Sequence, residues 1–250
     1  MTRYKLVFLL LVVLALTRPA HAQNTIFLSH GKIEYERRIN VYAQIGNDDD
    51  QWSEFRKKLS NHFKTSYFDL LFTRDKSLYR PGRESDDRDM FNFFAAPAQD
   101  NIVYADLDNA KAISQKNVFE QAFLVQDSLR QIRWKLTDET RNIAGFNCRR
   151  ANAIIMDSIY VVAFYTDEIL TGSGPESFTG LPGMILGVSL PHQHISWFAT
   201  KVEAIPVTES QVTPPTKGKK VSNAVLLETV KPSLKEWRKL GQQFLEAILL

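Results

Sequence analysis

Residues 151–166, ANAIIMDSIYVVAFYT, decide the fold class of this chain. Two apolar runs, 151–156 and 160–166, are rich in β-branched and aromatic side chains and flank Asp157-Ser158, a pair typical of tight turns. This pattern predicts an antiparallel β-hairpin. Similar runs predict further strands at 31–41, 67–72, 77–79, 102–107, 118–125, 129–136, 184–190 and 195–205.

The first predicted strand, 31–41, shows the clearest alternation. Apolar residues occupy its odd positions and polar residues its even ones, which is typical of a strand with one buried face. Arg37 alone interrupts the apolar positions.

A helix is predicted after this strand. Its apolar side chains recur at spacings of three and four, as on the buried face of an amphipathic helix, at Trp52, Phe55, Leu59 and Phe63. Further along, the polar residues 126–128 predict the turn between the strands at 118–125 and 129–136.

The C-terminal part is predicted to begin with a loop and end with a helix. Residues 206–223 are polar and contain two adjacent prolines, which predicts a loop or an exposed hairpin tip. Ser233 and Glu236 form an S-x-x-E capping box before an apolar stripe, which predicts a helix. We therefore expect a mainly β (α+β) fold, in which a curved antiparallel sheet carries an N-terminal helix and a C-terminal helix.

The N-terminus has the pattern of a secretory signal peptide. Arg3 and Lys5 precede an apolar run, and Ala20-His21-Ala22 supplies a cleavage pattern, so residues 1–22 are expected to be removed after Ala22. Residues 23–250 would then form a single exported domain in the periplasm or cell envelope, not spanning the membrane. Arg3, Lys5 and Arg18 account for the net charge of +3, so the mature chain would be formally neutral. A neutral chain gives no general attraction to nucleic acid.

The overall composition excludes several other classes of protein. With 44% hydrophobic and 24% charged residues, the chain can bury a core and is not disordered throughout. Its single cysteine, Cys148, excludes an internal disulfide and a Cys-rich zinc module. Gln23 follows the predicted cleavage point, where a lipoprotein needs a cysteine, so a lipid anchor is not expected.

Three stretches together resemble the GLPGLI family of exported proteins of bacteria such as Bacteroidetes. The first runs from WKLTDET at 134–140 to IAGFNCRRA at 143–151, and the second is AFYTDEI at 163–169. The third, GPESFTGLPGMIL at 174–186, is similar to the stretch that names the family, with Met184 in place of leucine. The resemblance implies an exported protein and carries over no catalytic residue.

The third stretch allows two interpretations. Pro182 fixes its own φ, and glycines beside it admit positive φ or a close backbone approach, so the stretch can be a corner that directs a strand into the sheet. It can also be a backbone cradle for a ligand or a partner. In the second case the candidate binding residues are Gly174, Pro175, Phe178, Gly180, Leu181, Pro182, Gly183, Met184 and Ile185.

His192 and His194 are the candidate metal ligands. If both lay on a strand, side chains two residues apart would face the same side and could reach one zinc or copper ion. A third ligand would have to come from elsewhere in the chain. No organic cofactor is predicted.

Two catalytic arrangements also remain open. A thiol arrangement would use Cys148 as nucleophile. His192 or His194 would be the base, and an aspartate such as Asp157 or Asp167 would orient that base. A carboxylate arrangement would hydrolyse envelope polymers or glycans with one acid from each of two motif segments. Its candidates are Asp138, Glu139, Asp167 and Glu168.

The function expected from the whole sequence is that of a non-enzymatic exported module. Curved sheets with helical covers make apolar pockets, so the module is expected to bind an apolar ligand, a peptide or a cell-envelope partner in the concavity of its sheet. The envelope hydrolase and a periplasmic metal-binding protein are the alternatives.

Overall fold

A computed structural model describes residues 27–44, 63–85 and 98–250, and in this part of the chain it contains one sheet of twelve strands. The strands are β1 (Gly31–Asn40), β2 (Phe63–Phe72), β3 (Lys76–Pro81), β4 (Ile102–Asp106), β5 (Lys111–Val118), β6 (Gln121–Ser128), β7 (Lys135–Ile143), β8 (Phe146–Ile155), β9 (Ile159–Thr166), β10 (Met184–Leu190), β11 (Ile195–Glu203) and β12 (Lys219–Val221). The chain is therefore mainly β, as predicted.

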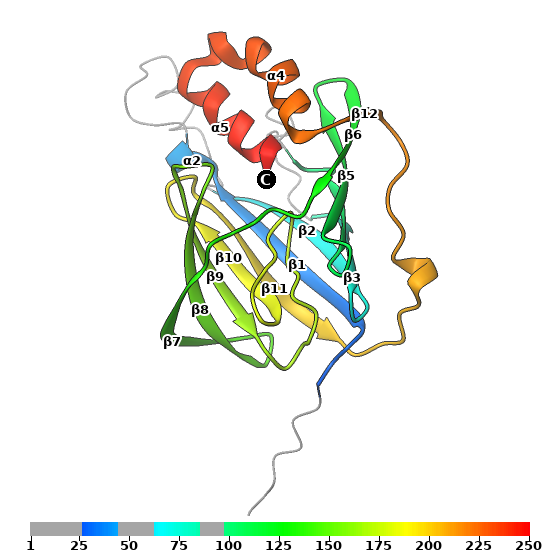
Figure 1. Cartoon of the computed structure of the whole chain (residues 1–250). Helices are drawn as coiled ribbons and strands as arrows, with labels where there is room; N and C mark the ends of the chain where they lie inside the picture. Colours follow the sequence, from blue (N-terminus) through cyan, green and yellow to red (C-terminus); the bar gives the residue numbers. More distant parts are fainter. Residues whose placement is uncertain (1–26, 45–62, 86–97) are drawn as a thin grey trace, which may run out of the picture.

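The sheet is built from two runs of sequential strands that meet at one seam. Its order is β12-β6-β5-β4-β3-β2-β1-β11-β10-β9-β8-β7, so the pairing of β1 with β11 joins the two runs. All neighbours are antiparallel except β12, which lies parallel to β6. Figure 1 shows that the sheet is strongly curved.

The two faces of the sheet differ across this seam. We call inner the face that carries Tyr35, Arg37 and Trp197, all of which are buried, and outer the face that carries Glu36 and Phe198. On β1 buried residues alternate with half-buried or exposed ones, as the sequence predicted. On the inner face the Tyr35 hydroxyl donates a hydrogen bond to the Ile185 carbonyl oxygen at 2.7 Å, which ties β1 to β10.

Two helices close one end of the sheet (Figure 1). They are α4 (Asn223–Leu234) and α5 (Arg238–Leu249), linked by the 3₁₀ turn η3 (Lys235–Trp237). Their apolar side chains form a small core with β5 and β6. The remaining helical segments are short, namely α2 (Val41–Gln44) and η2 (Glu209–Gln211).

The structure describes only one of the two predicted helical regions in full. Residues 52–62 of the N-terminal helix lie outside the described residues, and Phe63 begins β2. At the C-terminus two helices replace the single predicted one. The prediction that a helix begins at the Ser233 capping box was wrong, because Ser233 lies inside α4. The N-cap of α4 is Ser222, whose side chain accepts a hydrogen bond from the Val225 amide.

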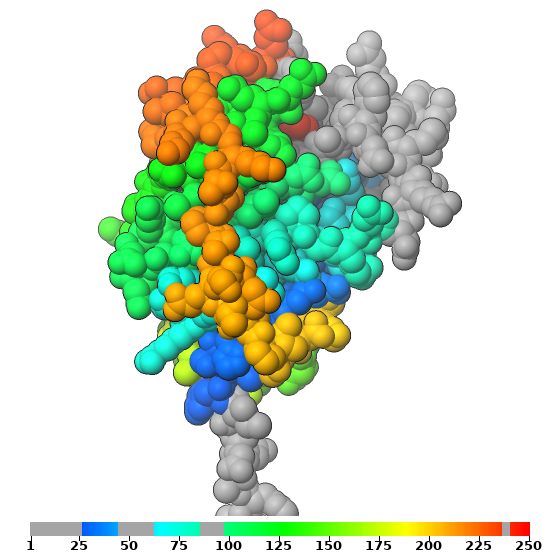
Figure 2. Space-filling view, turned by 90° about the vertical axis from the view of Figure 1, so that its right-hand side faces the viewer, coloured from blue at the N-terminus to red at the C-terminus, as the bar shows by residue number. Residues whose placement is uncertain are grey.

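The strand predictions were right for the 151–166 hairpin and wrong around β5 and β7. The predicted strand at 129–136 is irregular through residue 134, and β7 begins only at Lys135. Strands β8 and β9 pair through Ile155 and Ile159, around the predicted turn. The predicted turn at 126–128 instead lies at the end of β6, and the chain turns at Phe119-Glu120 between β5 and β6. Residues 206–222 cross one face of the molecule as an extended segment (Figure 2), and their last part adds β12 to the sheet.

Candidate functional site

The motif segment between β9 and β10 is packed inside the molecule. Phe178 is fully buried, and its ring meets the Trp197 ring edge-on at a centroid distance of 6.2 Å. Thr171 donates a hydrogen bond to the Thr73 carbonyl oxygen at 2.6 Å, and Trp134 donates one to the Thr179 carbonyl oxygen at 2.9 Å. The segment therefore fills space against the inner face of the sheet.

The glycines of this segment have a local structural reason. Gly183 has φ +139°, and a Cβ placed there would lie 2.1 Å from the Thr166 carbonyl oxygen. A Cβ at Gly174 would lie 2.8 Å from the Ile185 side chain. The geometry thus fits the corner interpretation, since the chain can enter β10 only without these side chains.

Most of the other motif residues predicted as a binding set are buried too. Pro175, Leu181, Met184 and Ile185 lie in the interior, whereas Gly180 and Pro182 are exposed. The structure brings these residues together as part of the main core and leaves only the tip of the corner at the surface.

A charged cluster lies beneath this segment. We call it the interior cluster, and its members, all at most 3% exposed, are Arg37, Asn101, Lys116 and Glu176. Glu176 belongs to the motif segment and has a positive φ of 51°. Asn101 Nδ2 donates a hydrogen bond to Glu176 Oε2 at 3.0 Å, and Arg37 Nη1 donates one to the Ala98 carbonyl oxygen at 2.8 Å.

Burial shifts the protonation equilibria of these groups. It raises the pKa of Glu176, against the opposing effects of Asn101, Arg37 and Lys116. It lowers the pKa of Lys116 to about 8, although the charge of Glu176 acts in the other direction. The charged form of each group is thus disfavoured by the loss of solvent, and the neighbouring charges offset this effect only in part.

Several buried polar side-chain atoms have no hydrogen-bond partner within the described part of the chain. One of them, Glu176 Oε1, belongs to the interior cluster. The charge of Glu176 adds to the effect of burial in raising the pKa of Tyr79. Such atoms are where ordered water completes the hydrogen bonding of a native interior.

The sequence held a signal for only one member of the interior cluster. Arg37 occupies an inward position in the alternation of β1, where an apolar residue is expected. Nothing in the pattern around Lys116 or Glu176 distinguishes them from surface charges, because both are brought inside by contacts with distant segments.

The candidate metal ligands lie in the turn after β10 and not on a strand. His192 and His194 are both exposed, and His194 has φ +56°. Within residues 27–44, 63–85 and 98–250, no three side chains of the histidine, cysteine, aspartate or glutamate types gather as a metal site. A zinc titration of the wild type and of a His192→Ala, His194→Ala variant still has to test the predicted pair.

The predicted catalytic groups lie in different surroundings. Cys148 is fully buried, and burial raises the pKa of its thiol to about 12, so the nucleophilic thiolate is disfavoured. Glu139 forms an ion pair with Arg150, while Asp138 and Asp167 are exposed.

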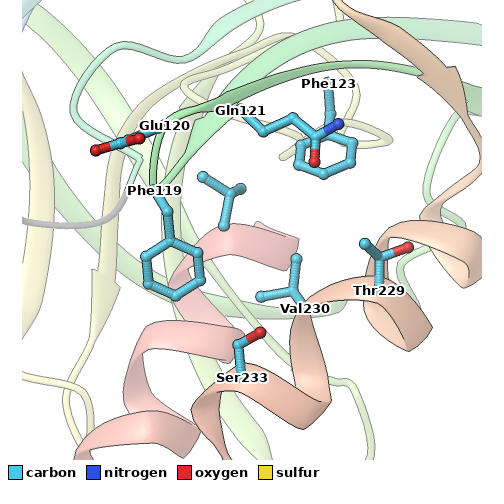
Figure 3. Close-up of a pocket in the computed structure, with 8 residues that line it drawn as sticks. Phe119, Glu120, Gln121, Phe123, Thr229, Val230 and Ser233 are labelled. Atoms are coloured by element: carbon cyan, nitrogen blue, oxygen red, sulfur yellow. The ribbon is translucent and has the colours of Figure 1, made fainter.

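A surface pocket lies between the β5–β6 turn and α4 (Figure 3). Its volume is about 280 Å³, and its buried apolar lining consists of Val118, Phe123 and Val230. Phe119 is 56% exposed at the turn and has φ +54°, which is unusual for a bulky side chain. Figure 3 shows its ring extending from the turn toward the C-terminal helices. Glu120, Gln121, Thr229 and Ser233 supply polar groups around the pocket.

Comparison with known proteins finds a short match to a family model of unknown function. A family model described as a protein of unknown function (Porph_ging) matches residues 154–187, a range that includes Glu176. No curated protein sequence gives a significant match. Among the described residues, no helix is both long enough and apolar enough to cross a membrane.

The fold itself resembles part of a larger protein, PNGF-II. One crystal form of PNGF-II, in space group C2, matches with a TM-score of 0.52 and 13% identity over 84% of this chain and 33% of that chain. A second form, in space group P21, gives a TM-score of 0.51 at 13% identity, over 84% of this chain and 34% of that one. The present chain thus spans about a third of the length of PNGF-II.

Proposed function

We propose that this chain is an exported, non-enzymatic module of the GLPGLI type that binds a peptide or a cell-envelope partner in the periplasm or cell envelope. The signal-peptide pattern of residues 1–22 supports export, and the motifs at 134–151, 163–169 and 174–186 support the GLPGLI assignment. The likeness to PNGF-II supports the idea of a module, because there a similar fold takes up about a third of a longer chain.

The buried ionisable side chains of the interior cluster support a structural role for these groups, not a catalytic one. Arg37, Lys116 and Glu176 are buried and bonded to Ala98, Ile248 and Asn101 respectively. The motif segment occupies the space against the inner face of the sheet, where an apolar ligand was expected to bind. These contacts favour a partner that binds at the surface over one that enters the sheet.

The main support for the proposal is the exposed side chain of Phe119 beside the pocket in Figure 3. A large aromatic side chain with positive φ at a turn tip has an unfavourable backbone conformation, and such strain is concentrated at functional sites. The pocket beside it has an apolar lining surrounded by a few polar groups. We therefore assign partner binding to the β5–β6 turn and α4.

Photo-crosslinking in the source organism tests this assignment. A photoreactive phenylalanine analogue replaces Phe119 in one variant and Leu170 in the control, because Leu170 is also apolar and is 54% exposed. We expect a discrete crosslinked partner with the first variant and not with the second. Equal crosslinking at both positions, or none at Phe119, would contradict the proposal.

A further inference from the structure

The outer face carries a row of paired side chains that crosses six strands. Its members are Tyr67 on β2, Glu36 on β1, Phe198 on β11, Gly187 on β10, Phe164 on β9 and Arg150 on β8. Registered partners on antiparallel strands point to the same side, so these residues share one face. This face lies opposite Trp197 and is separate from the pocket at Phe119.

Arg141 lies over two aromatic rings of this row. A Cβ at Gly187 would lie 2.7 Å from the Phe198 ring, so the ring is in close contact with the β10 backbone. The guanidinium of Arg141, on β7, lies 4.7 Å from the Phe198 centroid and 5.8 Å from that of Phe164. The contact with these rings holds an exposed cation at a fixed place on a rigid sheet.

Arg141 is one of the cations of this face that have no acidic partner among the described residues. Four other cations of the outer surface are paired with carboxylates, in the pairs Lys32–Asp69, Arg38–Glu36, Arg83–Glu34 and Arg150–Glu139. In the described part of the chain, Arg141 makes no ion pair, and neither does Lys135, whose register partner Asn152 lies on the same face as Arg150. Arg80, opposite Asp69, is also exposed and makes no ion pair among the described residues, so this face carries an excess of positive charge.

We propose that this face binds an acidic peptide segment of a partner protein, with Arg141 as the main contact to a carboxylate. Charge complementarity favours an acidic occupant, and the planar guanidinium suits a carboxylate because it can donate two parallel hydrogen bonds. An apolar side chain of the same peptide would contact Ile154, which is 65% exposed on this face of β8. Ile154 makes a peptide a better fit than a free carboxylic acid.

The contact with these rings also lowers the conformational cost of binding. Phe198 and Phe164 already restrict the Arg141 side chain, so less rotamer freedom is lost when a carboxylate binds. A lysine at this position would keep the charge but lose both the stacking and the paired hydrogen bonds.

Isothermal titration with synthetic peptides tests the proposal on the full mature chain. The probe is a short peptide of alternating glutamate and leucine, and its matched control has glutamine in place of glutamate. We expect the acidic peptide to bind and the neutral one to bind at least roughly tenfold more weakly. Arg141→Gln should weaken binding of the acidic peptide by a similar factor, and Arg141→Lys by less.

Arg83→Gln is the matched control variant. Arg83 is likewise exposed and stacked, on Tyr67 at 3.3 Å, but it is already paired with Glu34, so this change should leave peptide affinity within about twofold. Absence of binding at about 1 mM peptide, or equal losses in the two variants, would overturn the proposal. Free glutamate binding as tightly as the peptide would overturn the choice of a peptide. Because this face and the Phe119 pocket are distinct, a failure here leaves the crosslinking result unaffected.

Discussion

Lys116 Nζ donates a hydrogen bond of 2.7 Å to the carbonyl oxygen of Ile248, so a buried cation from β5 caps the end of α5. Arg130 donates a second hydrogen bond to the neighbouring carbonyl of Leu249. Cations are favourable at a helix C-terminus because the last carbonyl groups carry partial negative charge. The two residues thus fasten the final helix to β5 and to the segment that follows β6.

Replacement of Lys116 by methionine should change how stability depends on pH. The folded-state pKa of about 8 lies below the unfolded value of about 10.4, so between these values the unfolded chain binds more protons. This lysine therefore makes the wild type gain about 1 kcal/mol in free energy of unfolding from pH 7 to pH 9. Urea unfolding at both pH values should show this gain in the wild type and not in Lys116→Met. A gain of equal size in both proteins would show that Lys116 is not its source.

Replacement of Glu176 by glutamine should change the pH dependence of stability in the opposite direction, and at lower pH. Burial raises the folded-state pKa of Glu176, so the folded chain holds this proton more tightly and the carboxyl group costs stability as the pH rises through its unfolded value. The variant keeps an oxygen to accept the Asn101 hydrogen bond. We expect its stability to improve relative to the wild type between pH 4 and pH 7, as measured by thermal unfolding. A relative decrease would mean that the ionised carboxylate is net favourable.

Gly183→Ala should destabilise the protein much more than Gly145→Ala. Both glycines have positive φ, but a Cβ at Gly145 meets nothing within 4 Å, whereas one at Gly183 collides with the Thr166 backbone. The Gly145 change should cost about 1–2 kcal/mol from its backbone conformation alone, and the Gly183 change roughly 3 kcal/mol or more. Urea unfolding of the two variants gives the comparison, and similar costs would argue against a tight corner at Gly183.

The thiol of Cys148 should be unreactive in the folded protein. It is fully buried and its pKa is raised to about 12, so little thiolate is present at pH 8. An aromatic disulfide reagent should label it only after unfolding in guanidinium, with the unfolded protein serving as the positive control. Rapid labelling of the native protein would require an open route to this residue.

Strands with a strong alternation or a continuous apolar run were predictable, whereas β5 was not. Residues 111–118 contain few large apolar side chains, chiefly Ile113 and Val118, so no apolar pattern marks this strand. Much of its stability comes from pairing with β4 and β6. Likewise β12 has only three residues and follows a long polar segment, so no local pattern marks it.

The candidate site was predictable only where it depends on local sequence. The corner at Gly183 follows from residue types that restrict or free the backbone. The interior cluster does not, because Glu176 and Lys116 meet through contacts between segments far apart in the chain, and burial of a charge leaves no periodic signal. The row under Arg141 depends on the register of six strands, which no single segment specifies.

The seam between β1 and β11 has a consequence for the order of folding. On either side of it, most strands pair with sequence neighbours, so each run can form through local contacts. The seam itself pairs residues near 35 with residues near 199, and loop closure over such a distance is slow. Until it forms, each run exposes an unpaired strand edge at what becomes the middle of the sheet. Those edges make the half-formed chain most prone to aggregation just before the two runs join.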